Sequence, residues 1–321
     1  MSLYSFIHDR VDVQQGFGAR LLRPRVKFAR GLQAPPLTTN HQMVGGAFGY
    51  LLRFCLQRIN PQARASAWVA ERGADLIDLR QRAGKGRDVP TPSRHTRSLR
   101  AAAYVADAKR RCQAYTEDGQ VTEELLEAAY RLAHLDLAIR AGPDRIDWRS
   151  INYLRSEDAA DLKALLEIVD EGTFRVARAC ILDPRLPASE LVGGGDPDFI
   201  LDYCVLDVNT SNKPRLDVRD VYRLVGYYLL LGLGGISHEN GRTEQCAVNS
   251  IGIYFARFGQ LWKVPVKEIL PPRSVPEMTR WFVESVSSSG RGRSGSPGAF
   301  EGPLAVYLSE LDGGAVREKE R

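Results

Sequence analysis

Residues 193–214 read GGGDPDFILDYCVLDVNTSNKP, and this stretch decides the fold. Two short apolar runs, 199–201 and 204–206, are separated only by Asp202 and Tyr203. Apolar runs of this length around a two-residue interruption are typical of antiparallel strands joined by a tight turn. The sequence therefore predicts a β-hairpin.

The predicted hairpin brings acidic side chains together. A two-residue turn fixes the register, so that Asp198 lies opposite Asp207 and Asp196 lies opposite Asn209. Directly opposed Cβ atoms are about 5 Å apart, and like charges there are destabilising unless a proton or a cation lies between them. Carboxylates are the ligands that Mg²⁺ and Mn²⁺ prefer, so Asp198 and Asp207 are the predicted metal ligands.

A simpler interpretation of the same residues involves no metal. Acidic residues are common in turns and at strand edges, where they face water. In that case Asp196, Asp198 and Asp202 are solvated turn residues, and Asp207 is paired with an arginine. The two interpretations differ in register, because a shift of one residue would separate the carboxylates.

Outside the hairpin, apolar residues recur mostly at three- and four-residue steps, which is the period of amphipathic helices. Such patterns predict helices over 41–58, 63–81, 96–115, 122–141, 157–182 and 217–231. Two further strands are predicted at 250–256 and 260–264. The expected fold class is α/β or α+β, with a central mixed sheet of four or five strands, flanking helices and an N-terminal helical extension.

Three regions are expected along the chain. Residues 1–150 form a basic helical region that includes the first core helix, 151–286 form the core, and 287–321 form a flexible linker and tail, since SSSGRGRSGSPG lies within them. A length of 321 residues suits one large or two small domains, and 44% hydrophobic with 26% charged residues excludes fibrous and wholly disordered classes.

The charge is divided unevenly along the chain. Residues 1–111 contain 20 Lys and Arg against 7 Asp and Glu, a balance of +13, whereas the remainder carries −8. A basic half attached to an acidic half suits a phosphate-binding surface beside a carboxylate site, although charged runs are also commonly solvated helix faces.

Other features exclude several classes of protein. No apolar run of eighteen residues occurs, and His8, Asp9 and Arg10 interrupt any N-terminal signal-peptide pattern, so we expect no membrane association and a cytoplasmic location. The five cysteines contain no CxxC, which argues against a disulfide framework, a zinc site and an iron–sulfur site.

The segment 193–214 resembles the core of the PD-(D/E)XK nuclease superfamily, in which an Asp, a hairpin and an Asp/Glu-x-Lys triplet form the metal site. The resemblance extends to VGGAFGYLLRFCLQR as the first core helix, to VYRLVGY at 221–227 as the helix after the triplet, and to SIGIYFARFGQLWKVPV. The chain is most similar to bacterial nuclease-like proteins of the RecB-like branch with a degenerate motif. The resemblance implies that Asp198 and Asp207 bind Mg²⁺ or Mn²⁺.

This sequence departs from the superfamily pattern at three positions. Asn209 stands where the catalytic lysine is expected, Arg223 replaces a glutamine, and Gly49 stands where a relative often has an acidic residue. Tyr227 keeps its place one turn after Arg223. An asparagine supplies no positive charge, so slow cleavage or none is expected unless Lys213 or Arg223 takes the part of the lysine.

Two functions are consistent with these residues. The first is a nuclease-like protein of a bacterial defence or mobile-element system that binds DNA without sequence specificity, through its basic first third, and has a degenerate phosphodiesterase centre. The second is a catalytically inactive interaction subunit of a larger protein complex, which keeps the fold and binds no nucleic acid.

Overall fold

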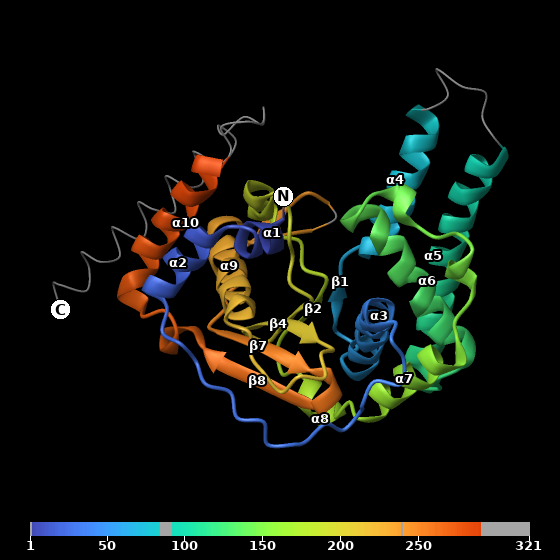
Figure 1. Cartoon of the computed structure of the whole chain (residues 1–321), viewed down its shortest axis with the longest axis horizontal. Helices are drawn as coiled ribbons and strands as arrows, with labels where there is room; N and C mark the ends of the chain where they lie inside the picture. The colour runs from blue at the N-terminus through green and yellow to red at the C-terminus, as the bar shows by residue number, and fades with distance from the viewer. Residues whose placement is uncertain (1, 84–91, 239, 290–321) are drawn as a thin grey trace.

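A six-stranded mixed sheet forms the centre of the computed structural model, which describes residues 2–83, 92–238 and 240–289 (Figure 1). The strand order is β1-β2-β3-β4-β7-β8, with β1 parallel to β2, β4 parallel to β7, and the other neighbours antiparallel. The strands are β1 (Arg64–Ala65), β2 (Cys180–Leu182), β3 (Phe199–Leu201), β4 (Cys204–Asn209), β7 (Ser250–Phe255) and β8 (Gln260–Pro265). A separate pair consists of β5 (Ile236–Ser237) and β6 (Thr243–Glu244).

The predicted hairpin and its register are confirmed. Phe199 pairs with Leu206 and Leu201 with Cys204, across a turn in which Asp202 has a φ of 53°. The Asp202 carboxylate accepts hydrogen bonds from the backbone N–H groups of 177–179, so this acidic residue stabilises the turn. The second predicted hairpin is also present as β7 and β8.

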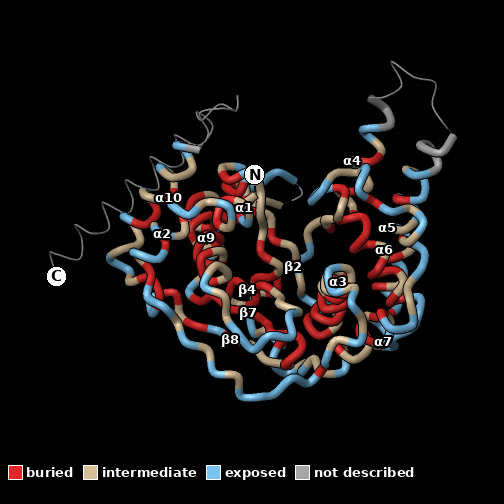
Figure 2. Tube along the Cα trace, viewed as in Figure 1, coloured by how far each residue is buried: buried red, intermediate tan, exposed pale blue. Residues whose placement is uncertain are grey.

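The sheet separates two hydrophobic cores because alternate residues of a strand point to opposite faces. Leu206 belongs to one core, and Val205 belongs to the other. The first core is built with α3 (His41–Ile59), α4 (Val69–Ala83), α5 (Pro92–Asp118), α6 (Glu123–Arg140) and α7 (Ser156–Glu167). The second is built with α1 (Leu3–His8), α2 (Val11–Arg20), α9 (Val218–Gly234) and α10 (Val275–Ser289), and the buried residues of both cores are seen in Figure 2.

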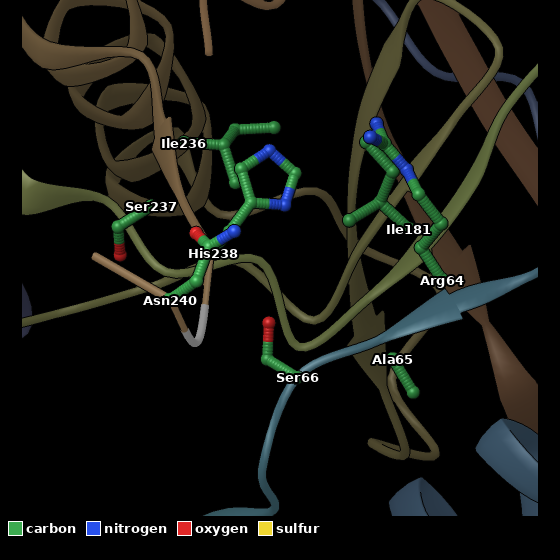
Figure 3. A pocket seen from close by; sticks show the side chains of 8 residues that line it. All are labelled: Arg64, Ala65, Ser66, Ile181, Ile236, Ser237, His238 and Asn240. Carbon is green, nitrogen blue, oxygen red and sulfur yellow. The ribbon is translucent and has the colours of Figure 1, made fainter. Parts of the chain in front are cut away.

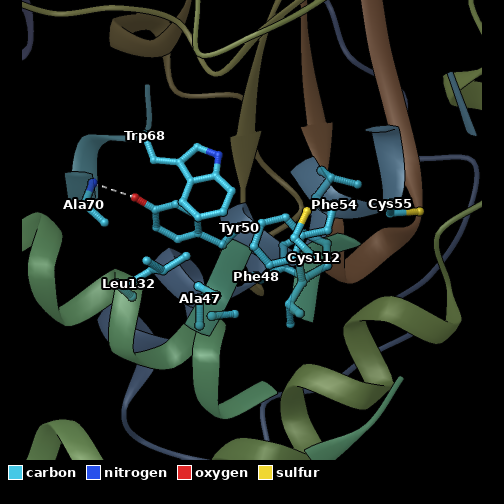
Figure 4. Close-up of a cluster of buried hydrophobic side chains, with 14 of the residues drawn as sticks. Ala47, Phe48, Tyr50, Phe54, Cys55, Trp68, Ala70, Cys112 and Leu132 are labelled. Atoms are coloured by element: carbon cyan, nitrogen blue, oxygen red, sulfur yellow. Dashed lines mark hydrogen bonds between the residues drawn. The ribbon is translucent and has the colours of Figure 1, made fainter. Parts of the chain in front are cut away.

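A polar pair is embedded in the first core, as Figure 4 shows in part. The hydroxyl of Tyr50 on α3 accepts a hydrogen bond from the backbone N–H of Ala70, 3.0 Å away, and donates one to Asp136 on α6, 2.5 Å away. Burial raises the pKa of Asp136 to about 6. These contacts tie α3, α4 and α6 together within an otherwise apolar cluster.

The helix predicted over 157–182 is wrong beyond Glu167. The chain instead forms α7, the short helix α8 (Glu171–Phe174) and then β2, which is buried along its whole length. A strand covered on both faces reads as a continuous apolar run, which periodicity alone does not distinguish from a helix. The helix predicted from residue 63 begins only at Val69, because Arg64 and Ala65 pair with β2.

The ends of the described chain differ from the sequence-based expectations. The helices α1, α2 and α10 were not predicted, and residues 287–289 belong to α10, so the predicted linker does not begin at 287. The rest of the expected linker and tail, 290–321, lies outside the described residues. In the described part of the chain, no helix combines the length and apolar character required to cross a membrane.

A buried arginine after β7 joins several elements. Arg257 is 1% exposed and makes a two-pronged contact with Asp161 of α7, with N–O distances of 2.8 and 3.0 Å. Its remaining donors reach the carbonyl oxygens of Thr210, 2.8 Å away, and Ala34, 3.1 Å away. A single guanidinium therefore links α7, the end of β4 and the N-terminal segment.

Arg257→Met should lower the free energy of unfolding by about 3–5 kcal/mol, because it leaves the buried Asp161 carboxylate without a counter-charge. The measurement is urea denaturation of the purified protein. The matched control, Arg257→Met with Asp161→Leu, removes both charges and should recover much of this loss. A cost of under about 1 kcal/mol for the single variant would contradict the role given to Arg257.

Candidate functional site

Asp198 and Asp207 are brought together where β3 begins and β4 approaches its end. Asp207 is buried, with 5% exposure, while about a third of the Asp198 side chain is exposed. An oxygen of Asp198 accepts the backbone N–H of Val208 at 2.8 Å, which fixes this carboxylate beside β4. The register deduced from the two-residue turn thus places the two aspartates on the face of the sheet that α9 covers.

The α9 helix carries a cation into this pair. Asp217 caps the helix by accepting the N–H of Arg219, and the apolar face of α9 packs on the sheet. Arg223 then directs its Nε to an Asp207 oxygen, 2.8 Å away, and its Nη2 to an Asp220 oxygen, 3.3 Å away. Tyr227 follows one turn later and is buried. Arg223 and Tyr227 are therefore both part of the site.

A second cation enters from the other side of the sheet. Arg53 lies on α3 among buried apolar residues, and its Nε and Nη2 contact the Asp183 carboxylate at 2.7–2.8 Å and 2.6 Å. Its Nη2 also lies 3.5 Å from an oxygen of Asp198. Gly49 lies beside this group: a Cβ at that position would come within 3.2 Å of Arg53 Nη1.

Sequence reasoning missed Arg53 and Asp183. A signal for Arg53 was present, since a charged residue interrupts the apolar run LLRFCL in the middle of a predicted core helix. The Arg53 guanidinium lies 5.6 Å from the centre of the Phe199 ring and 5.1 Å from that of Tyr50. Asp183 carried no such signal, because its place in the site depends on the turn after β2, where its φ is 51°.

The electrostatics of the site follow from burial. Burial raises the pKa of Asp207 to about 6, with Asp198 adding to the rise and Arg223 opposing it. Burial likewise raises the pKa of Asp183, against the effect of Arg53, and the pKa of Asp220, against that of Arg223. Each buried carboxylate is thus held beside a guanidinium that opposes its protonation.

The other predicted residues lie outside this charge network. Asn209 ends β4, and its side-chain oxygen accepts the N–H of Ser211 at 2.8 Å in a local turn. Lys213 is exposed, and within the described residues it forms no ion pair. Asn209 and Lys213 line a polar pocket of about 200 Å³ together with Tyr4, His8, Ser211, Arg215, Asp217 and Asp220.

Asp196 does not join the carboxylate pair through the ladder, because β3 begins only at Phe199. Its oxygen accepts the N–H of Leu186 at 3.0 Å and approaches the Ser189 hydroxyl at 3.4 Å. Asp196 therefore holds the 3₁₀ turn η4 (Pro187–Val192). The three glycines at 193–195 all have positive φ, in agreement with the predicted bend.

The arrangement does not fit a bound Mg²⁺ or Mn²⁺. A divalent cation needs several oxygen ligands free to turn toward it. Here the Asp207 and Asp183 carboxylates are engaged by guanidinium groups, and the described residues include no cluster of three or more His, Cys, Asp or Glu side chains suited to a metal. Arg53 and Arg223 supply the positive charge that a metal would otherwise bring.

A larger hollow lies at the β1 edge of the sheet, away from the aspartate pair (Figure 3). It measures about 320 Å³ and is lined by Arg64, Ala65, Ser66, Ile181, Ile236, Ser237, His238 and Asn240. Its two basic side chains, Arg64 and His238, both contact Glu244, at 2.8 and 2.9 Å. Their charge is therefore already matched within the protein.

No protein-family model, curated protein or solved structure matches this chain. The assignment of the site rests on its residues and their geometry.

Asp207 should titrate with a pKa of about 6, and Arg223→Met should move this pKa upward, because the variant removes the cation that opposes protonation. Carboxyl ¹³C chemical shifts recorded against pH provide the measurement. Arg219→Met, which removes the partner of Asp217 on the same helix, is the control and should leave Asp207 unchanged. A pKa for Asp207 at or below the ordinary 3.8 would be inconsistent with its burial.

The same shift predicts how stability depends on pH. Because the pKa of Asp207 is higher in the folded protein than the ordinary 3.8, its contribution to stability is full below that value and is lost as the pH rises through about 6. Asp207→Asn should flatten this part of the profile of unfolding free energy against pH. An unchanged profile would mean that Asp207 does not titrate in this range.

Proposed function

We propose that the chain is a nuclease-like DNA-binding protein with a PD-(D/E)XK core that does not cleave DNA. The succession of α3, the strands β2, β3 and β4, the helix α9 and the strand β7 supports this proposal. It agrees with the order of first core helix, hairpin, following helix and further strand that the resemblance implies. Asp198 and Asp207 also lie side by side, as the nuclease motif requires.

The observation that carries the inactive state is the pairing of Asp207 with Arg223. Metal-dependent phosphodiester cleavage needs a cation that polarises a phosphoryl oxygen and lowers the pKa of a bound water. A guanidinium holds its proton at physiological pH, so it provides charge but not this chemistry. Asn209 adds no cation either, and its side chain is engaged in a turn.

DNA binding is proposed from the charge distribution. The balance of +13 in residues 1–111 favours polyanions, and the counterions released from the phosphate backbone drive such binding without sequence specificity. A role in a bacterial defence or mobile-element system belongs to the same proposal. An interaction subunit that binds no nucleic acid is the competing outcome, and the same experiment distinguishes the two.

The wild-type protein should bind duplex DNA at low salt and release it steeply as salt increases, yet cleave neither plasmid nor linear single-stranded DNA in Mg²⁺ or Mn²⁺. Fluorescence anisotropy across a salt series and gel analysis of the incubated DNA measure the two properties. Asp207→Ala is the control for cleavage and should be indistinguishable from wild type.

Two results would contradict the proposal in different ways. Cleavage by the wild type that disappears in Asp207→Ala would mean that the centre is active, with Arg223 in the part of the missing lysine. No binding to any duplex at low salt would exclude the DNA-binding function and leave the interaction subunit.

A further inference from the structure

The chain between α2 and α3, residues 21–40, is an extended segment that we call the basic strap. In Figure 1 it runs along the outer side of β8 from one group of helices to the other. Backbone and side-chain hydrogen bonds fix it at several points: the N–H of Leu22 to the carbonyl of Ile269 at 2.9 Å, and that of Ala29 to the Gln260 side chain at 2.9 Å. The strap is therefore a built part of the surface.

Side chains of the strap alternate between the core and solvent. Val26 and Phe28 pack against the second core, and the Phe28 ring lies 4.9 Å from that of Phe255. Arg23, Arg25 and Lys27 are exposed on the other side. Residues two apart in an extended chain are about 6.5 Å apart on one side, so these three cations form a row.

The charge of this row is not matched within the protein. No Asp or Glu occurs between residues 13 and 70, and the described residues provide no ion pair to Arg23, Arg25, Lys27 or the nearby Arg30. Many other cations of the basic half do have partners: Arg53, Arg58, Arg64, Arg80, Lys109, Arg110 and Arg111 all form ion pairs. Much of the unmatched charge in the described part of the basic half therefore lies on the strap.

We propose that the basic strap is the surface that contacts the phosphate backbone of duplex DNA; this inference rests on the proposed function. A linear row of exposed cations suits a linear polyanion. Proteins that prefer single strands add exposed aromatic rings on which bases stack. The aromatic residue of the strap, Phe28, is instead packed against Phe255 and Phe258, which favours contact with the backbone of a duplex.

The test compares two variants from which the same charge is removed. One replaces Arg23, Arg25 and Lys27 with Gln, and the control replaces Arg100, Arg145 and Arg149 with Gln, three exposed arginines that have no ion pair among the described residues. All six side chains are exposed, so both variants should fold, which circular dichroism verifies. Binding to a random-sequence duplex is measured by anisotropy across a salt series.

The affinity of the strap variant should fall at least tenfold at low salt. Its log–log salt slope should decrease by about 2.7, at roughly 0.9 for each phosphate that is no longer neutralised. The control should change affinity by less than about threefold. Equal affinity of the two variants, with wild type binding normally, would overturn the strap while leaving the proposed function intact.

Two further arms separate the remaining outcomes. A wild type that binds no duplex at all would refute the proposed function, and the strap inference with it. Vesicles containing phosphatidylserine form the last arm: if the strap variant no longer binds vesicles but still binds DNA, the strap is a membrane contact and the inference is wrong. Tighter binding to a single strand than to the duplex would also overturn it.

Discussion

Pairing of buried carboxylates with guanidinium groups is the constraint on which the architecture depends. An unpaired charge in a protein interior is strongly destabilising, so each such carboxylate must have a counter-charge held in place by the fold. Arg223 meets Asp207 from α9, Arg53 meets Asp183 from α3, and Arg257 meets Asp161 of α7 from the end of β7. These pairs fix how the helices on both sides of the sheet sit against the strand ends, where apolar packing alone would tolerate small shifts.

The same pairing determines what the site can do. In a metal-dependent nuclease, adjacent carboxylates are costly and a divalent cation relieves their repulsion, which makes the cation part of the active state. In this protein the relief is permanent, since arginines fixed by their helices supply it. The site therefore gains stability as a structural joint at the expense of the open coordination that catalysis requires. Binding to DNA then depends on a different surface, where cations are left without partners.

The hairpin, its register and the helices α3 and α9 could be predicted, because each depends on local signals: a two-residue turn, alternation, and a 3.6-residue period. The pairing of Asp198 with Asp207 followed from the register alone. The long helix expected over 157–182 could not be corrected from sequence, since β2 is buried on both faces and gives no alternation. The partners Arg53 and Asp183 are 130 residues apart in sequence, and only tertiary packing brings them together.

The central claim is that Arg53 and Arg223 take the place of a metal ion, and thermal unfolding with and without Mn²⁺ tests it most directly. The wild type should show no rise in melting temperature with Mn²⁺, because its carboxylates are already paired. Arg223→Gln should melt at a lower temperature, and Mn²⁺ should restore part of the loss by binding the freed Asp207 in the folded state. A clear stabilisation of the wild type by Mn²⁺ that Asp207→Asn abolishes would contradict the claim.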